Sequence, residues 1–118
     1  MGASYKDLVV WQRGMQLSAQ IYRLTSEFPA SEQFGLTNQL RRASVSIPSN
    51  IAEGFGRSTK GEFLQFLGHA RGSNCELQTQ IILSETLGFG SKKERDAAEH
   101  LSADVSRVLI APMKKLKE

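Results

Sequence analysis

Apolar residues recur at steps of three and four along most of this chain, and no other feature constrains its fold as strongly. In residues 7–28 the row consists of Val10, Leu17, Ile21, Leu24 and Phe28, with Gly14 at the remaining step. That spacing places the side chains along one face of an α-helix. No segment alternates apolar and polar residues over the length that a strand needs. The sequence therefore predicts an all-α protein.

Three further segments carry the same spacing. They extend from about Ser31–Leu36 to Gly54, from Thr59 to Gly88, and from Ser91 to Leu116. Thr59 and Ser91 each precede a glutamate by three residues, which is the spacing of a capping box at a helix start. Short connections between long helices favour antiparallel neighbours. We therefore predict that residues 1–118 form one domain, an antiparallel up-down-up-down four-helix bundle.

Two prolines fall inside the predicted helices. Pro48 removes one backbone hydrogen bond in the second helix, and Ser44, Ser46 and Ser49 could satisfy the freed groups. We therefore predict that the second helix is kinked at Pro48 rather than interrupted. Pro112 puts the last turn of the fourth helix in question.

Two of the predicted helices carry apolar residues outside their core rows. The additional residues are Leu8, Trp11, Met15 and Tyr22 in the first helix, and Val45 and Ala52 in the second. A lone bundle needs one buried face per helix, so this surplus predicts a homo-oligomer. Gln20 is assigned to a polar, solvated strip of the first helix.

Charge and composition bear on the partners and the cellular location of the protein. Lys and Arg outnumber Asp and Glu by 15 to 12, a mild excess that permits an anionic partner without requiring one. Cys75 is the only cysteine, so no intrachain disulfide can form. No apolar run is long enough for a membrane span or a signal peptide. We expect a cytoplasmic protein that does not engage a membrane.

Candidate catalytic and metal-binding groups are sparse. His69 and His100, the only histidines, belong to neither His-Glu-x-x-His nor Glu-x-x-His. His100 shares a helix face with Asp96 and Asp104, a spacing more typical of a solvated stripe than of a metal site. We expect no metal, no cofactor and no enzymatic activity.

The remaining reactive side chains are predicted to be structural. Cys75 lies about 120° around the helix from His69, so the two do not form a nucleophile and base, and we predict a buried thiol. Glu53 and Glu76 are predicted to pair with Arg41, Arg42 or Arg71 and so to fix the second helix.

The basic residues are the candidate binding site. They are Arg41, Arg42, Arg57, Lys60 and Arg71, which folding could gather into one surface for nucleic acid or leave scattered. Trp11, Phe63 and Phe66 fall in or beside apolar rows, so they are assigned to the core. Without exposed aromatic residues we expect contacts to phosphate rather than stacking on bases.

Several motifs in the first three segments resemble those of a known family. They are Leu8, Val10-Trp11-Gln12, Phe28-Pro29 with Glu32, Gly35-Leu36-Thr37, Gln39 to Ala43, Ser46-Ile47-Pro48-Ser49-Asn50-Ile51-Ala52-Glu53-Gly54, Ala70, Gly72-Ser73 and Glu76-Leu77. The chain resembles the 23S rRNA-intervening sequence proteins, small four-helix bundles encoded within bacterial large-subunit ribosomal RNA genes. It departs from the family pattern at Asn74, where an apolar residue is more typical, and at Pro112.

The family is in turn similar to the accessory protein of diversity-generating retroelements. That protein is a basic pentameric barrel that binds nucleic acid and a reverse transcriptase. The resemblance implies a homo-oligomer, with a pentamer preferred, and RNA, DNA or a reverse transcriptase as partners. We therefore expect a non-enzymatic oligomeric protein that binds nucleic acid through a basic surface. The alternative is an oligomeric scaffold that binds only proteins.

Overall fold

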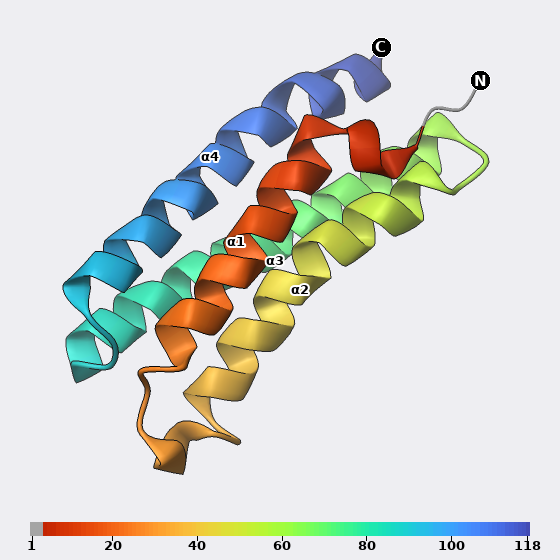
Figure 1. The fold of residues 1–118 in the computed structure, drawn as a ribbon. Helices are drawn as coiled ribbons and strands as arrows, with labels where there is room; N and C mark the ends of the chain where they lie inside the picture. Colours follow the sequence, from red (N-terminus) through yellow and green to blue (C-terminus); the bar gives the residue numbers. More distant parts are fainter. Residues whose placement is uncertain (1–3) are drawn as a thin grey trace.

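Four long helices run antiparallel to their neighbours in the computed structural model, which describes residues 4–118 (Figure 1). They are α1 (Val9–Thr25), α2 (Leu36–Phe55), α3 (Lys60–Leu87) and α4 (Lys92–Lys117), with short 3-10 helices η1 (Tyr5–Asp7) and η2 (Ala30–Glu32). Each helix packs against the next, and α4 returns to α1, which closes the bundle. The predicted four-helix architecture is confirmed.

Apolar rows of all four helices meet along the bundle axis. The large side chains with almost no exposed surface are Leu17, Ile21, Leu24, Leu40, Ile47, Ile51, Leu67, Leu77, Ile81, Val105 and Leu109. Each of these belongs to a row of helical spacing in the sequence. The rows therefore identify the faces that form the core.

The starts of α3 and α4 are capped by Thr59 and Ser91, but the glutamates do not complete the predicted capping boxes by accepting from the cap backbone N–H. Thr59 Oγ1 accepts a hydrogen bond from the backbone N–H of Glu62 at 3.1 Å, and Ser91 Oγ accepts one from that of Glu94 at 3.2 Å. α3 ends at Gly88, whose φ of 73° is the left-handed conformation common just after a helix.

Of the apolar residues outside the core row of the first helix, only those at its start are shielded from solvent. Leu8 and Trp11 are half-buried, whereas Met15 and Tyr22 are exposed. Gln20 was assigned to a solvated strip, but it is 6% exposed and donates from Nε2 to a carboxylate oxygen of Glu94 at 2.8 Å. Because α1 packs against both α2 and α4, its buried arc includes Gln20 and excludes Met15 and Tyr22.

α2 is continuous through Pro48, so it does not end and restart there. Proline has no N–H for the carbonyl oxygen four residues earlier, which belongs to Ser44. The hydroxyl of Ser18, on α1, donates to that oxygen at 2.8 Å. The predicted compensation by the serines of α2 is therefore wrong. The compensating hydrogen bond comes from α1. This helix approaches α2 closely because Gly14 has no side chain to meet Pro48.

The fourth helix also continues through its proline. α4 extends past Pro112 to Lys117, so the expected disruption of its last turn is not observed. Met113 is buried in the core and Leu116 packs against it. This packing holds the final turns in the helix despite the missing hydrogen bond.

Asn74 lies in the core between α3 and α4. Its Nδ2 donates to Ser102 O and to Ser106 Oγ, both at 2.9 Å, and its Oδ1 accepts from Ser102 Oγ at 2.7 Å. The departure from the family pattern at this position is thus matched by serines on α4, which satisfy the buried amide.

Candidate nucleic-acid interface

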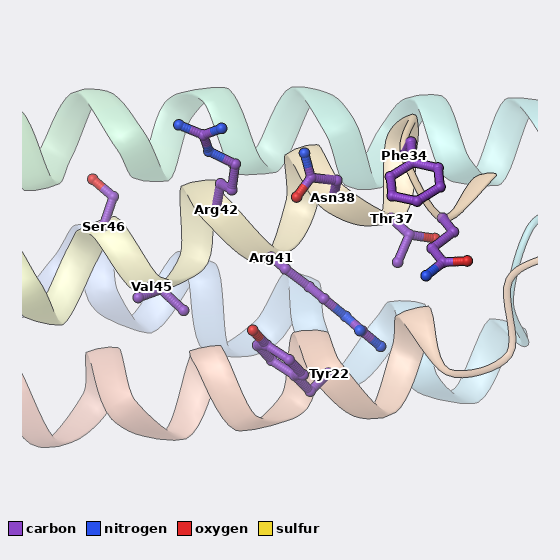
Figure 2. Close-up of a pocket in the computed structure, with 9 residues that line it drawn as sticks. Tyr22, Phe34, Thr37, Asn38, Arg41, Arg42, Val45 and Ser46 are labelled. Carbon is purple, nitrogen blue, oxygen red and sulfur yellow. The ribbon is translucent and has the colours of Figure 1, made fainter.

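An open groove of about 640 Å³ follows the surface between α1 and the first half of α2. Its lining residues are Tyr22, Gln33, Phe34, Thr37, Asn38, Arg41, Arg42, Val45 and Ser46. We call it the α1–α2 groove (Figure 2). It combines two of the five predicted basic residues with aromatic and amide side chains.

Arg41 is held in place on the floor of this groove. Its guanidinium carbon lies 4.4 Å from the centre of the Tyr22 ring, and its Nε donates to Thr25 Oγ1 at 2.8 Å. Thr25 is itself fixed, since its hydroxyl donates to the carbonyl of Ile21 at 2.7 Å. No carboxylate in residues 4–118 forms an ion pair with Arg41. Its charge is therefore oriented but not neutralised.

Arg42 is exposed and projects toward α3, whereas Arg41 extends toward α1 (Figure 2). It also lines a smaller groove of about 380 Å³ between α2 and α3, which contains Glu76. The carboxylate of Glu76 accepts a hydrogen bond from Gln80 Nε2 at 3.2 Å. Within the described chain Arg42 has no ion-pair partner either.

The other predicted basic residues lie elsewhere. Arg57 and Lys60 are at the connection between α2 and α3, at the opposite end of α2 from the α1–α2 groove. Arg57 follows Arg42 by fifteen positions, a separation that corresponds to roughly 22 Å along a helix. Arg71 is exposed on α3 and lines neither groove. The structure thus places Arg41 and Arg42 together, separate from the Arg57 and Lys60 pair.

The predicted pairing of Glu53 and Glu76 with Arg41, Arg42 or Arg71 is wrong. Glu53 binds Arg57 at 2.9 Å, one turn further along the chain, and Glu76 binds Gln80 in the same relation. Side chains four residues apart on one helix are already neighbours. These local partners therefore replace the long-range pairs that we expected.

The expectation that no aromatic ring is exposed is also wrong. Phe34 is 89% exposed and Tyr22 is 46% exposed, and both line the α1–α2 groove. Phe34 precedes Gly35 and falls outside every apolar row, and this was the signal in the sequence that it does not belong to the core.

The predicted burial of the Cys75 thiol is wrong. Cys75 is exposed rather than buried, because the adjacent Asn74 takes the position that faces α4.

Asp104 forms ion pairs with Arg107 and Arg13. The hydrogen bond from Arg107, together with the charges of both arginines, lowers the pKa of Asp104 below its ordinary value. Among residues 4–118 no three His, Cys, Asp or Glu side chains form a group that could hold a metal.

None of the described helices is both long enough and apolar enough to cross a membrane.

Comparison with known proteins identifies the family. A solved structure from Bacteroides thetaiotaomicron VPI-5482, a protein of unknown function from the S23 ribosomal protein family, has a TM-score of 0.82 at 20% sequence identity. The similarity covers 90% of this chain and 99% of that chain, and it shows a shared fold. No curated protein matches the chain. The family described as 23S rRNA-intervening sequence protein matches residues 6–111, so this chain belongs to that family.

Proposed function

We propose that this protein is a non-enzymatic, self-assembling protein that binds nucleic acid in the α1–α2 groove. The observation that carries the proposal is the pair formed by Arg41 and Arg42, neither of which has an ion-pair partner among residues 4–118. Guanidinium groups bind phosphate oxygens through paired hydrogen bonds. An oriented guanidinium such as that of Arg41 also loses less side-chain entropy on binding.

Self-assembly is proposed from an adjacent apolar surface. A groove of about 310 Å³ between the first half of α1 and the second half of α2 is lined by Tyr5, Trp11, Met15, Ser18, Val45, Pro48, Ser49 and Ala52. We call it the apolar groove. Contact with a second copy would bury its exposed side chains, which favours association. Symmetry would then repeat the α1–α2 groove, and several weak phosphate contacts would act together. A pentamer is preferred from the family resemblance alone.

Sedimentation tests the assembly. We expect the wild type to sediment at about micromolar concentration as an oligomer, with a pentamer preferred, and Val45→Glu to sediment as a smaller species because a charge would be desolvated in the interface. Ile82→Glu is the matched control, since Ile82 is exposed on α3 outside this groove. A monomeric wild type, or equal effects of the two substitutions, would contradict the assigned interface.

Charge removal tests the binding site. We expect Arg41→Ala/Arg42→Ala to weaken binding of RNA and DNA oligonucleotides and to make the log–log salt dependence shallower by about 1.4 on a single strand, or about 0.7 per lost phosphate contact. The measurement is fluorescence anisotropy at several salt concentrations, with assembly checked in parallel.

Two double variants control for this loss of charge. Lys114→Ala/Lys117→Ala removes the same charge from exposed positions near the end of α4 and should leave the slope unchanged. Arg57→Ala/Lys60→Ala tests the second basic pair. A change of slope only in this last variant would move the interface to the connection between α2 and α3. Equal changes in all three variants would mean diffuse attraction to the whole surface.

A protein-binding scaffold is the second candidate, and the apolar groove favours it. A reverse transcriptase, which the resemblance to the retroelement accessory protein suggests, would be a partner of this kind. Under this proposal the folded oligomer shows no salt-sensitive binding of RNA or DNA, and the Arg41→Ala/Arg42→Ala variant keeps its protein partner.

A further inference from the structure

Phe34 is held in an exposed position by the connection between α1 and α2. Glu32 fixes this connection: its carbonyl accepts from the N–H of Gly35 at 3.0 Å, and its Oε1 accepts from the N–H of Leu36 at 3.1 Å. The ring of Phe34 is 89% exposed, although burying an aromatic side chain would stabilise the fold. The backbone therefore presents an aromatic face that the bundle itself does not use.

The same end of the α1–α2 groove contains polar groups of complementary chemistry. Figure 2 shows Arg41 extending along the groove toward the end at which Phe34 lies, with Asn38 between Phe34 and Arg42 along α2. The side-chain amides of Gln33 and Asn38 are exposed, and each offers both a donor and an acceptor. Positive charge, an open aromatic ring and free amides thus line one continuous surface.

We propose that the α1–α2 groove binds single-stranded RNA, with one unpaired base stacked on Phe34 and the adjoining phosphates on Arg41 and Arg42. This inference rests on the proposed function and names its substrate. Stacking on aromatic side chains combined with a basic groove is the general mode of single-strand binding. A continuous duplex keeps its bases stacked on one another and offers the ring no free face.

The amides of Gln33 and Asn38 favour RNA over DNA. The 2′-hydroxyl of ribose both donates and accepts hydrogen bonds, and it is the group by which a protein distinguishes the two polymers. One additional hydrogen bond corresponds to roughly a fivefold difference in affinity. We therefore expect a matched single-stranded DNA to bind about fivefold more weakly than the RNA.

Phe34→Ala tests the stacking contact, and the exposure of the ring means that its loss leaves the fold intact. The probe is a fluorescein-labelled, single-stranded RNA of about 12 nucleotides, within the usual span of such sites. We expect Phe34→Ala to weaken binding by about 5- to 150-fold, the range for one stacked base. Ile110→Ala removes a 64% exposed apolar side chain near the end of α4 and should leave the affinity unchanged.

An abasic strand of the same length separates stacking from phosphate contacts. The wild type should bind it about as weakly as Phe34→Ala binds the intact strand, whereas Phe34→Ala should bind both strands equally. Phe34→Trp should bind the intact strand more tightly than Phe34→Ala does. RNA should quench the fluorescence of the added tryptophan beyond any change seen in the wild type, which contains only Trp11.

Equal binding of intact and abasic strands by the wild type would overturn the stacking inference while the proposed function stands. So would a Phe34→Ala variant that changes the sedimentation behaviour but not the RNA affinity, since Phe34 would then be a protein contact. Equal affinity for RNA and DNA single strands would overturn the assignment of RNA. A folded wild type that binds no strand and no duplex would overturn both proposals.

Discussion

Replacing Asn74 with alanine is expected to lower the free energy of unfolding by about 3 kcal/mol, because the buried hydroxyl of Ser102 would lose its acceptor and the volume of the amide would be left empty. Urea denaturation followed by circular dichroism measures the change as a lower midpoint with an unchanged slope. Cys75→Ala is the matched control on the next residue; since Cys75 is exposed, its effect should stay within about 0.5 kcal/mol.

A second pair of variants isolates the hydrogen bond from the loss of volume. Asn74→Leu introduces the apolar residue that is typical of the family, but it still leaves the Ser102 hydroxyl without an acceptor. Adding Ser102→Ala removes that hydroxyl, so the double variant should recover much of the lost stability. An Asn74→Leu protein more stable than the wild type would contradict this explanation.

Gly54→Ala is expected to destabilise the bundle by about 2 kcal/mol through overpacking. A Cβ at this position would lie 2.6 Å from Phe66 Cβ and 3.1 Å from Phe63 Cδ1, so α2 and α3 would have to move apart. Alanine otherwise stabilises a helix interior by about 1 kcal/mol relative to glycine. The expected loss therefore has the opposite sign to the intrinsic preference.

Gly72→Ala is the control for the sign of the stability change at Gly54. Gly72 lies within α3, and a Cβ there would meet nothing within 4 Å. We expect this substitution to raise the free energy of unfolding by about 1 kcal/mol, measured under the same conditions. Two changes of the same sign would show that contact between α2 and α3 does not decide the effect at Gly54.

Helical spacing predicted where the helices lie, but it did not predict the burial of every side chain. It identified the core rows, the caps at Thr59 and Ser91, and the core position of Asn74, because each depends on residues close in sequence. It misassigned Gln20 and Cys75. The exposure of those two side chains depends on how neighbouring helices flank their helix, and the period of one helix does not contain that information.

The candidate site was predictable in part for the same reason. Arg41 and Arg42 are adjacent in sequence, and both line the α1–α2 groove although their side chains project toward different helices. Arg57 was a candidate for the same surface, but the length of α2 separates it from the groove. Phe34 was missed because its exposure is set by hydrogen bonds that the carbonyl and the carboxylate of Glu32 accept from the N–H groups of Gly35 and Leu36, outside any periodic segment.

The salt dependence of RNA binding by the wild-type protein tests the central proposal most directly. Each phosphate contacted on a single strand contributes about 0.7 to the slope of the logarithm of affinity against the logarithm of salt concentration. Arg41 and Arg42 together therefore predict that affinity falls with salt with a slope at least as steep as about −1.4. A folded, assembled wild type that binds no RNA, or binds it with an affinity independent of salt, would contradict the proposal that this groove holds nucleic acid.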